Sequence, residues 1–438
     1  MANTLNIRKF LLILGDIVFL YLSLIATIFF GYWGSFGWEI VSSHFLPFSM
    51  LYFFWLVVFY IFGLYELRIV RAGSLFYAKI AGGLLACFLV GISFFYLIPI
   101  FDITPKTNLI INTVAFGILF LIWRKGFFSL FAGRLLNRVA IVGEDGIKQE
   151  LKEAILSRPY LGYKLVEIDE QKDLLEEIKE NKIDTLIIPA ELNPESKLAK
   201  ELYGLLPARI NFMDWAQAYE LICEKIPVSF IPHSWFLKNL KEGERAVYDR
   251  FKRTADIILS FLIVIITSPV SVVISLIIKL QDGKSVLYRQ ERVGRDGKRF
   301  SLLKFRSMKE NAEDRTGAVW AEEKDPRVTK IGKFLRSSHF DELPQMLNIL
   351  KGDISLVGPR PERPEFVEQL SGEIPHYQIR HLIKPGFTGW AQIKFRYGRT
   401  IMDAKEKFEY DLYYLKNRNP LLDLGILLKT IQLFFKKN

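Results

Sequence analysis

Cysteine is almost absent from this sequence: 438 residues contain two, Cys87 and Cys223. A single distant pair cannot build a disulfide framework or a zinc cluster, and so few cysteines are typical of a reducing compartment. Zinc-finger, homeodomain and RNP patterns are also missing, which argues against nucleic acid as a partner. The net charge of +11 therefore indicates an anionic membrane surface or phosphorylated substrates.

Long apolar stretches are abundant, and the mean hydropathy of +0.19 is too high for an ordinary soluble protein of this size. We predict that residues 1–125 form a membrane domain. Four segments in it approach the roughly 20 residues that a spanning helix needs, namely 10–31, 45–65, 78–101 and 108–123. No convincing cleavage site follows Arg8 and Lys9, so we interpret the first segment as an uncleaved anchor.

Basic residues in the short loops predict the orientation, because such residues accumulate on the cytoplasmic side. The first loop, 32–44, has no Lys or Arg, whereas Arg68 and Arg71 lie in the second. Arg124 and Lys125 follow the fourth segment. This pattern places both the N-terminus and everything after residue 124 in the cytoplasm.

Residues 137–235 are predicted to be a soluble, Rossmann-like α/β domain. A buried strand and turn occupy 138–146, and further strands are expected at 184–190 and 209–214, with charged helical stretches between them. Such alternation favours a parallel sheet. The turn at 143–148 reads G-E-D-G-I-K and lacks the G-x-G-x-x-G spacing, so we favour a domain without a bound dinucleotide.

The apolar segment 254–278 is long enough to cross a bilayer but carries basic residues on both flanks. Pro269 lies near its middle, and proline bends a helix. The hydroxyl of the preceding Ser268 can satisfy a carbonyl that the proline leaves free. These features predict a re-entrant helix that enters and leaves the membrane by the cytoplasmic face. The alternative is a kinked spanning helix, which would place the rest of the chain outside.

The strongest chemical signal lies in residues 283–414, where Asp341 and Glu342 precede Pro344 and an apolar helix. Proline favours a first helical turn, so the carboxylates are expected at a helix N-terminus, which stabilises anions. An aspartate can attack phosphorus and form an acyl phosphate. A neighbouring carboxylate can hold Mg²⁺, which predicts Glu342 as a metal ligand. The alternative is a solvated acidic helix start.

Cations suited to phosphate occur in two nearby stretches. Lys304 and Arg306 would share one face of a strand. Arg360 lies in a rigid turn between two prolines, and its planar fork suits bidentate contact with phosphate. We therefore predict all three as substrate-binding residues, with Arg360 the best placed.

Three blocks of this region are D-E-L-P-Q at 341–345, L-K-G-D-I-S-L-V-G-P-R-P at 350–361 and P-G-F-T-G-W-A-Q at 385–392. On these motifs, residues 248–438 resemble the bacterial sugar transferase family, the monotopic polyprenyl-phosphate phosphoglycosyl transferases. The four apolar segments and the middle domain are similar to those of the long, exopolysaccharide-priming members. The resemblance implies a helix-rich α/β catalytic domain.

The resemblance also implies a reaction. A sugar-1-phosphate would pass from a UDP-sugar to undecaprenyl phosphate, releasing UMP, through a covalent intermediate on Asp341 with Glu342 and Mg²⁺ as its partners. Gln392 belongs to a block that lies near the family's active site. That block usually continues with N-G-R; here Arg396 and Arg399 are candidates to replace it. Ser268 and Pro269 match the family's helix break.

The family places such an enzyme in the bacterial inner membrane, at the first membrane step of exopolysaccharide, capsule or O-antigen synthesis. Membrane lipid is an expected partner, and a homodimer is compatible with the pattern. Residues 420–438 are predicted to form either an interfacial helix or a helix packed on the catalytic domain. The rival functions are an NAD-dependent nucleotide-sugar dehydratase and a non-catalytic scaffold of a polysaccharide-assembly complex.

Overall fold

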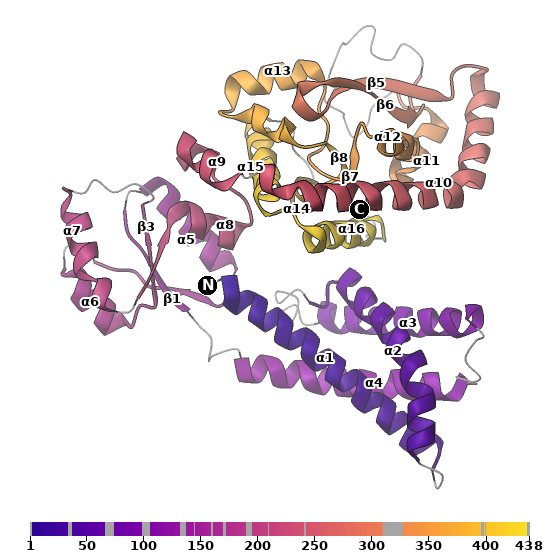
Figure 1. Ribbon diagram of the computed structural model, residues 1–438, viewed down its shortest axis with the longest axis horizontal. Helices are drawn as coiled ribbons and strands as arrows, with labels where there is room; N and C mark the ends of the chain where they lie inside the picture. Colours follow the sequence, from indigo (N-terminus) through magenta and orange to yellow (C-terminus); the bar gives the residue numbers. More distant parts are fainter. Residues whose placement is uncertain are drawn as a thin grey trace. The chain divides into compact units, whose positions relative to one another are not determined.

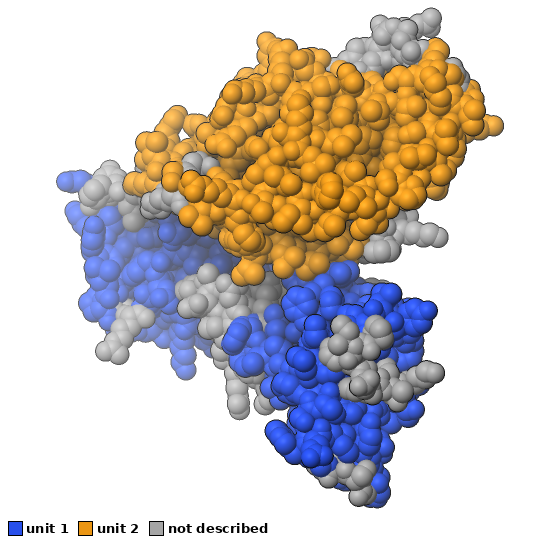
Figure 2. Space-filling model, turned by 45° about the vertical axis from the view of Figure 1, so that its right-hand side comes forward, with its two compact units in different colours: residues 1–223 blue, residues 224–438 orange. Residues whose placement is uncertain are grey.

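A computed structural model describes most of the chain, in two compact units, 1–223 and 224–438 (Figure 2). The described residues are 2–33, 37–65, 74–98, 106–131, 137–143, 145–158, 161–169, 172–189, 195–208, 210–240, 242–309, 327–395, 398 and 400–435.

The first unit begins with four long apolar helices, which confirm the four predicted segments. They are α1 (Ala2–Gly31), α2 (Trp38–Ile61), α3 (Ser74–Leu97) and α4 (Lys106–Phe131). Each is long and apolar enough to cross a membrane. Helix α1 packs along α4 (Figure 1).

Polar contacts inside this bundle hold its helices together. Arg124 of α4 forms an ion pair of 2.7 Å with Asp16 of α1, and both side chains are fully buried. Nearer the start of α4, Asn112 donates to Ser23 of α1 at 3.0 Å and to Tyr52 of α2 at 3.0 Å. In an apolar bundle a lone polar group is costly, so such groups pair across helices and specify the packing.

The rest of the first unit is a four-stranded parallel sheet in the order β2-β1-β3-β4. The strands are β1 (Asn137–Ile141), β2 (Tyr163–Leu165), β3 (Thr185–Ile188) and β4 (Asn211–Asp214). β1, β3 and β4 coincide with the three predicted strands, whereas the sequence did not indicate the short β2. The helices are α5 (Asp145–Ser157), α6 (Leu174–Asn181), α7 (Lys197–Gly204) and α8 (Trp215–Cys223). Helices α5 and α8 join one apolar cluster with the sheet, and α6 and α7 join another.

Residues just after Cys223 make contacts within the second unit, although the sequence grouped them with the middle domain. Lys225 forms an ion pair with Glu409 at 3.5 Å, and Ile226 N donates to Glu409 O at 3.1 Å. Trp390 donates its indole N–H to Glu224 O at 2.9 Å. Helix α9 (His233–Asn239) follows.

The longest helix is α10 (Ala246–Asp282), which contains the predicted apolar segment and Pro269. Figure 1 shows it as two arms joined by a sharp bend. Pro269 cannot donate to Ile265 O, and the Ser268 hydroxyl donates to that carbonyl instead, at 2.8 Å. Many of its apolar side chains are exposed, among them Phe261 and Ile266.

The second unit continues as a helix-rich α/β domain. An antiparallel hairpin joins β5 (Leu287–Val293) to β6 (Arg299–Phe305), and a short parallel pair joins β7 (Ser355–Val357) to β8 (Gly386–Thr388). The helices are α11 (Lys330–Ser338), α12 (Gln345–Lys351), α13 (Pro364–Glu373), α14 (Trp390–Lys394), α15 (Ile401–Asn417) and α16 (Pro420–Phe435). Met346, Ile349, Trp390 and Tyr414 lie in their common core.

Helix α16 packs on this domain through Ile426, which is fully buried, and through Asp423. The Asp423 carboxylate accepts from Lys252 of α10 at 2.6 Å and from Tyr414 of α15 at 2.7 Å. Leu421 and Leu424 are exposed. The helix is thus bound to the domain, and its placement at a membrane interface stays a prediction.

Glycines bring the second and third sequence blocks together, backbone against backbone. A Cβ on Gly386 would lie 2.0 Å from Gly358 N, and one on Gly389 would lie 2.2 Å from Gly358 O. Gly358 N donates to Thr388 O at 2.9 Å, and Gly386 N donates to Pro359 O at 2.8 Å. These glycines are needed because no side chain fits between the two segments.

We expect Gly386→Ala to destabilise the second unit by about 1–3 kcal/mol, because the added methyl group would push the two closely packed backbone segments apart. Gly372→Ala on α13 is the matched control, because a Cβ there meets no atom within 4 Å. It should leave stability unchanged or slightly higher, as alanine favours a helix. Thermal unfolding in detergent measures both, and equal melting temperatures would contradict the close approach.

Candidate active site

The acidic pair lies in a single 3₁₀ turn, η7 (Phe340–Glu342), which comes directly before Pro344 and α12. His339 ends α11 in a left-handed conformation, with φ of 57°, and redirects the chain into this turn. Both carboxylates are largely buried, with 8% of Asp341 and 9% of Glu342 exposed. The prediction that they lie at the start of a helix is confirmed, one short turn earlier than α12 itself.

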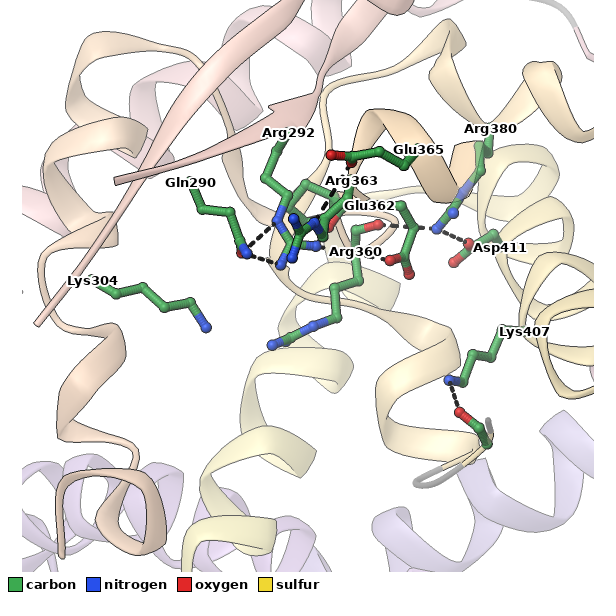
Figure 3. Close-up of polar contacts among 12 residues, drawn as sticks. Gln290, Arg292, Lys304, Arg360, Glu362, Arg363, Glu365, Arg380, Lys407 and Asp411 are labelled. Atoms are coloured by element: carbon green, nitrogen blue, oxygen red, sulfur yellow. Dashed lines mark hydrogen bonds and ion pairs between the residues drawn. The ribbon is translucent and has the colours of Figure 1, made fainter. Parts of the chain in front are cut away.

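Glu342 is bound by two cations from different parts of the fold. Its Oε1 accepts from Lys304 Nζ at 2.8 Å and from Arg360 at 3.0 Å. Lys304 is on β6 and Arg360 follows β7; Figure 3 shows their charged ends directed toward the same space. Burial opposes ionisation of Glu342, but the two cations outweigh it and hold the pKa of this carboxyl well below its usual range. Glu342 is therefore a fixed anion.

Asp341 has a different environment. No hydrogen bond from a described residue reaches its carboxylate. Burial, reinforced by the adjacent Glu342 charge, raises its pKa above the ordinary value, although Lys304 and Arg336 act in the opposite direction. A carboxylate that is poorly solvated and accepts no hydrogen bond has oxygen lone pairs available to attack an incoming group.

Hydrogen bonds from other segments to the backbone carbonyl groups of residues 360–362 hold the turn that carries Arg360. Arg380 donates to Arg360 O at 3.0 Å, and Arg292 donates to Pro361 O at 2.9 Å. Val293 N donates to Glu362 O at 3.0 Å. About half of the Arg360 side chain is exposed, so the backbone is clamped while the guanidinium still faces an approaching ligand.

Arg380 itself is buried and lies at the centre of a small network (Figure 3). It forms an ion pair of 2.8 Å with Asp411 of α15, and the two side chains are 5% and 2% exposed. It also donates to the Tyr377 hydroxyl. Burial lowers the pKa of the guanidinium, but the neighbouring Tyr377 and the Asp411 charge together outweigh it, so that the pKa is raised. Sequence reasoning missed this pair; its one signal was a charged residue, Asp411, within the apolar stretch Y-D-L-Y-Y-L.

Two other predicted site residues are not joined to the acidic pair by any described hydrogen bond. Gln392 donates to Phe387 O at 3.3 Å, and its Oε1 is buried without a partner among the described residues. Arg306 lies beyond the end of β6, and its backbone N–H donates to Val286 O at 2.9 Å. Their substrate-binding role stays a prediction. Arg396 and Arg399 lie outside the described residues.

The chemistry of the pair suits a hard cation such as Mg²⁺. Among the described residues, no three side chains of His, Cys, Asp or Glu gather as a metal cage. Magnesium is usually bound by one or two carboxylates together with waters and substrate phosphates, so such a cage is not required. Within the part of the chain that the structure describes, the hydrogen bonds to the Glu342 carboxylate reach Oε1 alone, which leaves Oε2 and the Asp341 oxygens as candidate ligands.

Comparisons with known proteins identify relatives of the region that contains the acidic pair. A family model described as "Bacterial sugar transferase" matches residues 247–437. A UDP-glucose:undecaprenyl-phosphate glucose-1-phosphate transferase of Klebsiella pneumoniae is 32% identical over 370 residues, which cover 78% of each chain. A UDP-N-acetylgalactosamine-undecaprenyl-phosphate N-acetylgalactosaminephosphotransferase of Aeromonas hydrophila is 43% identical over 186 residues, 42% of this chain and 44% of the relative. A putative undecaprenyl-phosphate N-acetylgalactosaminyl 1-phosphate transferase of Bacillus subtilis is 50% identical over 135 residues, 31% of this chain and 75% of the relative.

Proposed function

Because the chain belongs to the bacterial sugar transferase family, we propose that it transfers a sugar-1-phosphate from a UDP-sugar to a polyprenyl phosphate such as undecaprenyl phosphate. The observation that carries this proposal is the unequal acidic pair. Asp341 is buried without a described hydrogen bond, whereas Glu342 is bound by Lys304 and Arg360. The relatives are named for glucose and for N-acetylgalactosamine, so the proposal names UDP-sugars as a class.

In the first half-reaction, a carboxylate oxygen of Asp341 attacks the phosphorus that bears the sugar. A bond forms between that oxygen and phosphorus, the bridging P–O bond of the diphosphate breaks, and its electron pair leaves with UMP. Lys304 and Arg360 lie beside the pair and stabilise the charge on the phosphate oxygens. Asp341 and Glu342 would hold Mg²⁺, which when bound neutralises diphosphate charge.

In the second half-reaction, a phosphate oxygen of the polyprenyl phosphate attacks the same phosphorus. The acyl-phosphate bond breaks, Asp341 is regenerated as a carboxylate, and the sugar is left on a polyprenyl diphosphate. The two steps use one nucleophile in turn, which predicts ping-pong kinetics. We propose that this is the first membrane step of a surface polysaccharide.

The membrane placement is part of the same proposal. Arg253 of α10 donates to Ile349 O at 2.6 Å and to Leu350 O at 2.7 Å, at the end of α12. Asp256 of α10 accepts from Leu356 N of β7 at 3.0 Å. The exposed apolar helix is therefore tied to both elements beside the acidic pair. We infer that α10 is re-entrant from the cytoplasmic face of a bacterial inner membrane, which holds the site at headgroup depth. A homodimer stays a prediction.

The test uses the purified full chain in nanodiscs with Mg²⁺ and a panel of UDP-sugars. With undecaprenyl phosphate present, UMP release should be continuous; without it, we expect a burst of about one equivalent of UMP per chain, because the covalent intermediate accumulates. If no UDP-sugar gives UMP under either condition while the protein remains folded, the transferase proposal is wrong and a non-catalytic scaffold becomes the better explanation.

A further inference from the structure

A pocket of about 250 Å³ lies in the parallel-sheet part of the first unit, at the carboxyl ends of β1 and β2. Ile141 ends β1, Lys148 and Lys152 come from α5, and Leu165 and Glu167 come from β2 and the residues after it. Ligands of parallel α/β sheets bind at the carboxyl ends of the strands. None of these residues takes part in the transfer chemistry proposed above.

The polar lining of the pocket carries both signs of charge. Lys152 forms an ion pair with Glu167, and Lys148 is close enough to act on the same carboxylate electrostatically. Two ammonium groups suit a phosphate, whereas a carboxylate repels one and prefers hydroxyl donors. A simple anion would therefore be poorly matched, and a ligand that combines a phosphate with sugar hydroxyls would match both parts.

The remaining wall is aliphatic. Ile141, Leu165 and Ile168 line the pocket; Ile141 is almost fully buried, and the other two are partly buried. A cleft that combines an apolar wall with a few polar groups at one side is typical of small-molecule sites. Such a wall can contact the flat face of a nucleobase.

The neighbouring turn excludes a larger ligand. Gly143 follows β1 with φ of 114°, and a Cβ there would lie 2.4 Å from the ring of Trp215. The Trp215 indole also donates to Val142 O at 3.2 Å. In dinucleotide sites the diphosphate approaches the backbone of this turn, but here the indole occupies the space above it. The volume is also below the range of roughly 300–1,000 Å³ that is usual for sites of drug-sized ligands.

We propose that this pocket binds a nucleoside monophosphate. Its phosphate contacts Lys148 and Lys152, its ribose hydroxyls donate to Glu167, and its base lies on the aliphatic wall. This site is additional to the transferase site and does not depend on the proposed reaction.

The test is hydrogen exchange of the full chain in nanodiscs, with UMP and, separately, AMP as probes. We expect either nucleotide to protect peptides that cover 141–168. Lys152→Gln should raise the concentration needed for half protection by about tenfold, as expected for loss of one charge-assisted contact. UMP that lacks both ribose hydroxyls should bind similarly more weakly. Lys197→Gln, at an exposed position of α7, is the matched control and should change nothing.

Three outcomes would overturn the proposal. The first is no protection of 141–168 by UMP or AMP at about 1 mM, a concentration that detects even weak sites. The second is equal protection by inorganic phosphate, which would indicate an anion site only. The third is unchanged protection in Lys152→Gln. Protection of peptides around Asp341 is scored separately in the same data, so failure of the pocket and failure of the transferase proposal are distinguishable.

Discussion

Replacing Asp341 by asparagine is expected to lower kcat by about 10⁴-fold or more, because the amide cannot form the acyl-phosphate bond and loss of a nucleophile removes effects of this order. The burst of UMP in the absence of acceptor should disappear. Mass spectrometry should show a sugar phosphate on Asp341 in the wild type and none on the variant.

Asp296→Asn is the matched control for this substitution. Asp296 lies in the hairpin turn at φ of 56°, a conformation that asparagine tolerates, and its side chain is 60% exposed. This control should retain full activity. An undiminished UMP burst in Asp341→Asn would show that another group is the nucleophile.

Replacing Arg380 by methionine is expected to have the second largest effect. The buried Asp411 would lose its partner, and breaking a buried ion pair from one side costs about 3–5 kcal/mol. The Arg360 carbonyl would lose its hydrogen bond as well, so the turn that carries Arg360 would be less restrained. We therefore expect a lower melting temperature in detergent and a lower kcat/KM for the UDP-sugar.

A second variant separates stability from positioning. Arg380→Met combined with Asp411→Leu removes both charges, and replacing a buried pair by apolar residues often restores stability. The hydrogen bond to Arg360 O is still missing, so we expect a near-normal melting temperature with kcat/KM still reduced. Arg299→Met, at an exposed site on β6, is the control. Full recovery of activity in the double variant would show that Arg380 only balances Asp411.

Local patterns predicted a large part of this fold. Hydropathy located the four helices of the first unit, and alternation of strands and helices located β1, β3 and β4. Ser268 and Pro269 predicted the bend in α10 and the serine hydroxyl that satisfies the freed carbonyl. This was predictable because the hydrogen bond to Ile265 O involves residues within one helical turn. The three-residue β2 was missed because so short a strand has too few positions to show periodicity.

The candidate site was only partly predictable. Lys304 and Arg360 were predicted as substrate-binding residues, and the structure shows both paired with Glu342, which the sequence did not indicate. Arg306 was expected to share a strand face with Lys304, but β6 ends at Phe305, so strand alternation no longer applies. Arg380 was missed because its partner Asp411 lies 31 positions away in the sequence, and no local pattern reports such a contact.

The sequence by itself determined the apolar helices and the helix break, because these depend on neighbours within one or two turns of chain. It also indicated the family, because the order of three short motifs can be recognised without their contacts. Only the tertiary structure decided that Glu342 is bound by two cations while Asp341 is not, and that Gly358 and Gly386 must touch. The reason is physical: ion pairing, desolvation and backbone contact depend on distances between segments that are remote in sequence, and packing alone sets those distances.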